Sequence, residues 1–165
     1  MKYIYILALA TTIMFACKNS RTAEVKMDGG ERQNFKTQNE IDAEIITKYV
    51  AEKKLNGSYI NGGIYAVISD SGSGEKHPTV KDTVVVEYHG SFLNGTIFDE
   101  TKPGKTINFP LSNLIEGWKI GIPYLKKGGK ATFVIPSALA YGAQGSGQIP
   151  PNSVLSFDIV LLDFK

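Results

Sequence analysis

The chain has 165 residues, enough for one domain with a hydrophobic core and a short additional segment. Its formal net charge of +2 gives no reason to expect a nucleic-acid partner or an anionic membrane surface as a partner. The single cysteine excludes an internal disulfide framework and a cysteine-based zinc site.

The N-terminus has the features of a secretory signal. Lys2 precedes an apolar run over residues 3–15, which is too short to span a bilayer comfortably. The small residue Ala16 then stands directly before Cys17. This order of a basic start, an apolar core and a small residue predicts a signal peptide over residues 1–16.

The position of Cys17 resembles the lipobox of bacterial lipoproteins, in which this cysteine is lipidated and becomes the mature N-terminus. Met14 and Phe15 differ from the residues usual in that motif. We expect a lipid anchor on Cys17, with a plain secretory peptide as the alternative. Residues 17–36 are polar and contain little that could build a core, so they are expected to form a flexible tether.

A helix is predicted after the tether. Thr37 and Glu40 form a capping-box pattern at the start of an apolar series. The apolar positions are Ile41, Ile45, Ile46, Tyr49 and Val50. The helix should run to about Leu55 and stop at Asn56-Gly57, giving an N-terminal amphipathic segment over residues 37–57. Docking of this stripe on the following domain is the simplest interpretation, and dimerisation through it is the alternative.

A strand-like pattern begins at Gly63 and continues to the end of the chain. The predicted strands cover residues 64–68, 83–92, 96–98, 106–109, 130–135 and 154–164. Asn94-Gly95 is a strong hairpin signal, and a long loop is expected over residues 136–152. Asn94 and Asn56 also match glycosylation acceptors, but each is better explained by turn chemistry.

The only tryptophan lies in the segment 111–122. Gly117 and Gly121 are too close together for a long helix, so a short helix bearing Trp118 must be held by packing against the sheet. The predicted fold class is therefore α+β, with a curved antiparallel β-sheet wrapped around one short α-helix and preceded by the N-terminal amphipathic helix.

The sequence lacks the usual catalytic motifs. His77 and His89 have no nearby cysteine and no metal-ligand spacing, so both are interpreted as structural or surface residues. The glycines at 128–129 and 142–147 do not have the spacing of a phosphate loop or of a dinucleotide turn. An enzyme with this sequence would work without a nucleophile, a metal or a cofactor.

Three segments together resemble the FKBP-type peptidyl-prolyl isomerase domain. They are VVVEYHGSFLNGTIFDE at 84–100, LIEGWKIGI at 114–122 and AYGAQGSGQIPPNSVLSFDIVLL at 140–162. They occur in family order and at nearly family spacing, and the resemblance implies an isomerase domain over residues 58–165. The N-terminal cysteine and the helix resemble bacterial lipoprotein members, including some that are associated with gliding motility.

The resemblance implies a proline pocket. Its catalytic residues would be Tyr88, Phe98, Asp99, Tyr141 and Phe157, and its other substrate-binding residues Ile107, Phe109, Leu114, Ile115 and Trp118. Trp118 would form the floor, while the Ile115 N–H and the Tyr141 hydroxyl would bind peptide carbonyls. Asp99 would lie beside the twisting amide and pair with Tyr88, or would only orient that tyrosine. The alternative for the aromatic residues is a closed core without an opening.

Two positions depart from the family pattern. Ile107 stands where the family often has an aromatic residue, and the loop after Tyr141 is shortened, with Ser146 in place of a bulkier residue.

The resemblance also predicts function and partners. The expected activity is acceleration of rotation about X–Pro bonds in exported proteins, and the expected partners are proline-containing polypeptides and macrolide ligands. We expect a monomer in the cell envelope, anchored by lipid and facing the periplasm or the exterior. The alternatives are a non-catalytic chaperone module that binds proline segments and a structural lipoprotein of an envelope assembly.

Overall fold

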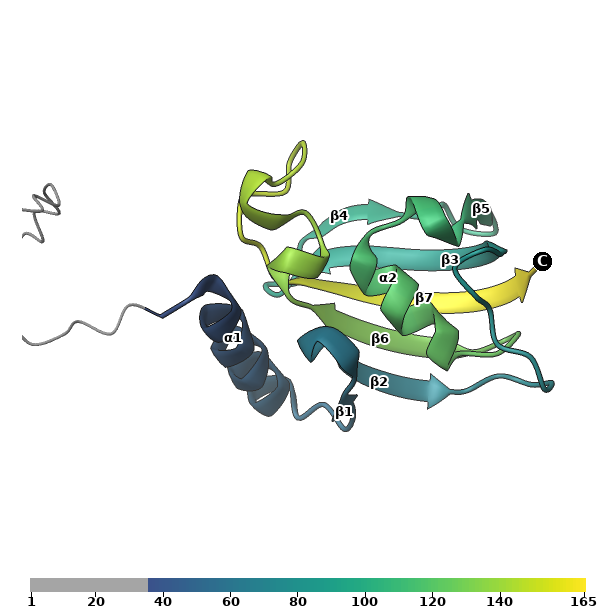
Figure 1. Ribbon diagram of the computed structural model, residues 1–165, viewed down its shortest axis with the longest axis horizontal. Helices are drawn as coiled ribbons and strands as arrows, with labels where there is room; N and C mark the ends of the chain where they lie inside the picture. Colours follow the sequence, from purple (N-terminus) through teal and green to yellow (C-terminus); the bar gives the residue numbers. More distant parts are fainter. Residues whose placement is uncertain (1–35) are drawn as a thin grey trace, which may run out of the picture. The chain divides into compact units, whose positions relative to one another are not determined.

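The computed structural model describes residues 36–165, which form an antiparallel sheet and two α-helices (Figure 1). The helices are α1 (Gln38–Lys53) and α2 (Glu116–Gly121). The strands are β1 (Ser58–Tyr59), β2 (Tyr65–Asp70), β3 (Thr83–Phe92), β4 (Ile97–Glu100), β5 (Ile107–Pro110), β6 (Lys130–Ile135) and β7 (Leu155–Phe164). Within this part of the chain, neither helix is long and apolar enough to cross a membrane.

All strand pairings in the sheet are antiparallel. The order is β1-β2-β6-β7-β3-β4. β4 and β5 both pair with the edge of β3 that faces away from β7: β5 with its first half and β4 with its second half. Side chains alternate between the two faces along β3 and β7, so that Tyr88 and Phe157 both point into the core. Gly90 lies opposite Phe157 in the ladder and leaves space on that face.

The short helix α2 lies across one face of the sheet (Figure 1). Its close approach depends on two glycines. A Cβ atom on Gly117 would lie 2.5 Å from the side chain of Ile135, and one on Gly121 would lie 3.1 Å from the ring of Phe133. Trp118 can therefore lie directly on the strands, where it is only 4% exposed. This arrangement agrees with the expectation from the glycine spacing.

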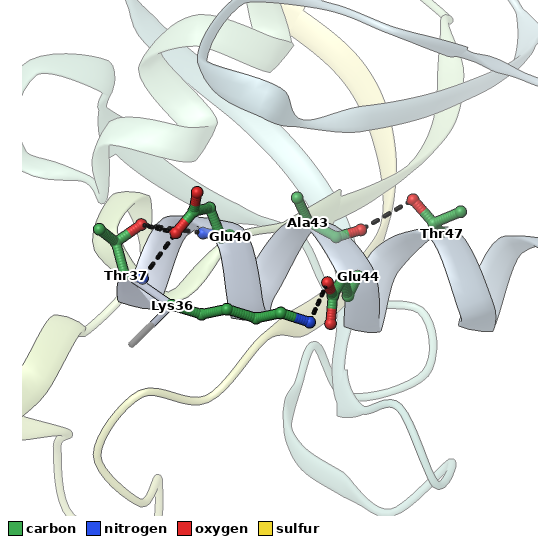
Figure 2. A network of polar contacts seen from close by, with 6 residues as sticks. All are labelled: Lys36, Thr37, Glu40, Ala43, Glu44 and Thr47. Atoms are coloured by element: carbon green, nitrogen blue, oxygen red, sulfur yellow. Dashed lines mark hydrogen bonds and ion pairs between the residues drawn. The ribbon is translucent and has the colours of Figure 1, made fainter. Parts of the chain in front are cut away.

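The start of α1 agrees with the predicted capping box. The Thr37 N–H donates to the Glu40 carboxylate at 2.7 Å, and the Glu40 N–H donates to the Thr37 hydroxyl oxygen at 3.4 Å (Figure 2). The helix ends at Lys53, about two residues before the predicted end near Leu55, because the cap residue Lys54 takes the left-handed conformation. The N–H groups of Lys54 and Leu55 bond back to the last turn, and this Schellman geometry turns Leu55 toward the sheet.

The face of α1 that docks on the sheet differs from the predicted stripe. Ile46 is fully buried against Val134, on the face of β6 opposite to α2. Ile41 and Ile45, by contrast, are 38% and 39% exposed. The buried polar residue Asp42 lies one turn before Ile46 and fixes the rotation of the helix, which leaves part of the apolar series outside. Docking is thus confirmed, but α1 is less amphipathic than predicted.

The α+β fold class is confirmed, and the predicted strand positions are correct to within about two residues. β2 and β4 extend to Asp70 and Glu100, beyond their predicted ends at Ile68 and Phe98. β1 was not predicted, because two residues show no alternation of polar and apolar side chains.

Candidate active site

A hollow of about 210 Å³ opens between α2, its preceding turn and the inner face of the sheet. It is lined by Tyr88, Asp99, Phe109, Leu114, Ile115, Trp118, Tyr141 and Phe157. These residues come from β3, β4, β5, the α2 region, the loop after β6, and β7. The structure thus brings together eight of the ten residues that the resemblance implied.

Trp118 is at the centre of the aromatic set. Its ring meets those of Tyr88 and Phe157 edge to face, with centroid separations of 5.2 and 5.6 Å. Phe109 lies at 6.5 Å on the remaining side. Such edge-to-face pairs are favourable beyond the area that they bury, so the rings hold one another in place while leaving the hollow open. Among the described residues, the buried indole nitrogen has no hydrogen-bond partner.

One edge of the hollow is polar. The Tyr88 hydroxyl donates to the Asp99 carboxylate at 2.6 Å. Burial raises the pKa of Tyr88, and the hydrogen bond to Asp99 and its charge raise it further. Burial also raises the pKa of Tyr141, with a smaller contribution from the charge of Asp99. Both hydroxyls therefore remain protonated near neutral pH and can act as hydrogen-bond donors.

Thr101 fixes the backbone of Tyr88 and was missed by sequence reasoning. Its hydroxyl accepts from the Tyr88 N–H at 3.0 Å and lies 3.2 Å from the Tyr88 carbonyl, to which its own N–H also donates at 3.0 Å. Thr101 is buried and directly follows β4. A threonine two residues after the Phe98-Asp99 pair was the signal available in the sequence.

Comparison with known proteins identifies the family. Residues 74–162 match the profile of the FKBP-type peptidyl-prolyl cis-trans isomerases. The chain belongs to this family.

The curated relatives of this FKBP chain include two FkpA isomerases. The protein named FKBP-type peptidyl-prolyl cis-trans isomerase FkpA from Buchnera aphidicola is 36% identical over 95% of this chain and 61% of its own length. FkpA from Escherichia coli K12 is 39% identical over 92% of this chain and 54% of its own length. The chain thus spans little more than half the length of these relatives.

Solved structures agree with the fold. The crystal structure of FkpA from Escherichia coli superposes with a TM-score of 0.68 at 40% identity, covering 77% of this chain and 59% of that chain. A peptidyl-prolyl cis-trans isomerase from Pseudomonas syringae gives a TM-score of 0.66 at 30% identity, covering 79% and 98% of the two chains.

Two implied residues, Phe98 and Ile107, do not line the hollow of this FKBP domain. Phe98 meets Phe157 edge to face, with ring centroids 5.7 Å apart. Ile107 pairs with Val86 along β5 and packs on the core. Both side chains pack on the core beside the lining residues. The ring of Phe98 lies over Gly90, next to a bulge in the pairing of β3 with β4, and Ile107 lies on the same face of β5 as Phe109, two residues away.

The loop after Tyr141 also reaches this wall. The side-chain amide of Gln148 donates to the backbone carbonyl of Phe98 at 2.5 Å, which ties the loop to β4 at the rim of the hollow. Sequence reasoning did not identify Gln148, since its partner is a backbone atom fifty residues away.

The remaining candidates lie elsewhere. His77 donates from Nδ1 to the Pro123 carbonyl at 2.9 Å, and the exposed His89 lies 3.4 Å from Glu100 on the outer face of the sheet. Residues 36–165 contain no cluster of His, Cys, Asp and Glu that could hold a metal.

Asn94 accepts from the Thr96 N–H within the hairpin turn. Cys17, the signal peptide and most of the tether fall outside the described residues.

Proposed function

We propose that this protein accelerates cis–trans rotation about X–Pro bonds, by holding proline in the aromatic hollow and stabilising the twisted amide. The observation that supports this most strongly is the open, ring-lined hollow around Trp118, with one polar edge formed by Tyr88 and Asp99. Family membership supports the same activity.

The physical task suits such a site. Rotation about an amide costs about 18–20 kcal/mol, because resonance is lost in the twisted state. Isomerisation of X–Pro bonds therefore takes tens to hundreds of seconds unaided. The twisted amide has a less polarised carbonyl than the planar one, so an apolar environment favours it. A differential preference of roughly 4 kcal/mol would give about a thousandfold acceleration without acid–base groups.

Each lining group has a proposed role in this process. Trp118 forms the floor beneath the proline ring, with Tyr88 and Phe157 as walls. The Ile115 N–H and the protonated Tyr141 hydroxyl donate hydrogen bonds to carbonyls of the peptide. Asp99 lies beside the rotating amide, where its negative charge interacts with the amide dipole as that dipole changes during rotation.

Isomerisation of a peptide of the Ala–Leu–Pro–Phe type tests the proposal. We expect wild-type protein to accelerate cis-to-trans conversion, and Phe98→Tyr or Asp99→Val to weaken this effect. Ile97→Ala is the matched control, because its side chain is 52% exposed on the same strand. Wild-type activity equal to buffer would refute the proposal, and binding of the peptide without acceleration would indicate a chaperone module instead.

We further propose that the protein is a monomer and is attached to the cell envelope through lipid on Cys17. The features in favour are the apolar run, Ala16 and the cysteine that follows it. Incorporation of labelled palmitate should occur in wild-type protein and disappear in Cys17→Ala. The mass in solution, measured by light scattering on the lipid-free variant, should be that of one chain. Wild-type protein without label would contradict the lipid anchor. A mass of two chains would contradict the monomer.

A further inference from the structure

The buried carboxylate of Asp42 is the starting point. Asp42 is fully buried on α1 and accepts two hydrogen bonds from Ser137, one from its N–H at 2.7 Å and one from its hydroxyl at 2.6 Å. The side chain of Gln38 donates to the other carboxylate oxygen at 2.7 Å. A buried carboxylate is tolerated only when donors replace the lost water, and here three do so. The two bonds from Ser137 join residues 95 positions apart in the chain.

Ser137 is placed at the base of the loop that carries Tyr141. It opens the 3₁₀ turn η4 (Ser137–Leu139), and the Ala140 N–H donates back to the Ser137 carbonyl at 3.0 Å. Tyr141 follows directly and lines the hollow. The Gly145 N–H then bonds to the Tyr141 carbonyl at 3.1 Å. One hydrogen-bonded turn therefore separates Ser137, the residue held by Asp42, from Tyr141 at the hollow, and the Tyr141 carbonyl is itself bonded to the next turn.

A second polar attachment of α1 lies at its other end and provides a comparison. The Tyr65 hydroxyl accepts from the Gly57 N–H at 2.9 Å and donates to the Leu55 carbonyl at 3.1 Å. This attachment fastens the chain after α1 to β2, and neither partner belongs to the loop after β6. Both attachments are hydrogen bonds between α1 or its end and the rest of the fold, but only the partner of Asp42, Ser137, lies in the loop that carries Tyr141.

We propose that Asp42 is a positioning residue for the reaction: through Ser137 it holds the loop so that the Tyr141 hydroxyl faces the bound peptide. This inference rests on the proposed isomerase function, because Tyr141 binds substrate only there. The helix α1 is then part of the machinery that shapes the pocket, in addition to being the segment that follows the tether.

The variants Asp42→Asn, Ser137→Ala and the double variant test this, with Tyr65→Phe as the matched control. We expect amide exchange over residues 140–145 to become faster in the first two variants. The dissociation constant for the proline peptide should rise about threefold or more. The double variant should add little to either single one, since both remove the same contact. Tyr65→Phe should lower the free energy of unfolding while leaving peptide affinity and loop exchange unchanged.

Peptide affinity and loop exchange equal to wild type in all four variants would overturn the inference, as would an effect of Tyr65→Phe as large as that of Asp42→Asn. If Asp42→Asn does not fold, Ser137→Ala decides alone, because it removes one hydroxyl and keeps the backbone donor. Failure of the proposed function is seen separately, as absence of acceleration by wild-type protein.

Discussion

At the scale of single residues, the hollow depends on a tyrosine and a carboxylate held 2.6 Å apart. Tyr88 is fixed twice, at its hydroxyl by Asp99 and at its backbone by Thr101. Such double fixation limits the rotation of the ring, so the wall of the pocket is in place before a peptide arrives.

The raised pKa values of Tyr88 and Tyr141 predict a loss of stability in alkali. An unfolded tyrosine loses its proton near pH 10, whereas the folded protein retains it to a higher pH. The folded state then binds more protons, so the free energy of unfolding is at its full value below about pH 10 and falls as the pH rises above that. Tyr88→Phe should show a shallower fall, measured by urea unfolding at about pH 8 and about pH 11. Parallel falls in the two proteins would contradict the prediction.

Gly90 should not tolerate even one methyl group. An added Cβ would lie 2.8 Å from the ring of Phe98 and 2.9 Å from that of Phe157, so both rings would have to move. We expect Gly90→Ala to lower the free energy of unfolding by about 1–3 kcal/mol and to reduce isomerase activity. The neighbour His89 is exposed on the other face, and His89→Ala should change stability by about 0.5 kcal/mol or less. Equal stabilities of the two variants would show that the rings can adapt.

At the scale of elements, the start of α1 is set by contacts local in the sequence, whereas its docking face is set by tertiary contacts. Its start could be predicted because a capping box is a contact within four residues. Its docking face could not, because the rotation of the helix is set by Asp42 and Ser137, which no local pattern connects.

Thr37→Ala should destabilise the protein by about 1 kcal/mol, since it leaves a helix N–H without its acceptor. Thr47→Ala is the control: that hydroxyl donates to the Ala43 carbonyl inside α1, which is already bonded in the helix (Figure 2), and its other contact, at 3.0 Å to the Tyr59 hydroxyl, is exposed to solvent. We expect the control to change stability less, because alanine is a better helix former. Urea unfolding of both variants measures the difference, and a larger loss in Thr47→Ala would contradict the assignment of the cap.

At the scale of the whole molecule, the sequence predicted the sheet and the short helix α2 well. Alternation along β3 and β7 and the glycines beside Trp118 are strong local signals. It also predicted most of the lining, through the family resemblance. It did not predict the supports behind the lining, because Thr101, Gln148 and Asp42 act through backbone atoms or through residues distant in the chain.

The central claim is that the ring-lined hollow itself accelerates rotation about the imide bond. Exchange NMR of a proline peptide, with and without a macrolide ligand that we propose binds in the hollow, tests it most directly. We expect cis–trans exchange to be faster with the free protein, with rotation in the bound peptide up to about a thousandfold faster than in buffer. Exchange should return to the buffer rate when the ligand fills the hollow. Exchange at the buffer rate with free protein, or acceleration that persists with the hollow blocked, would contradict the claim.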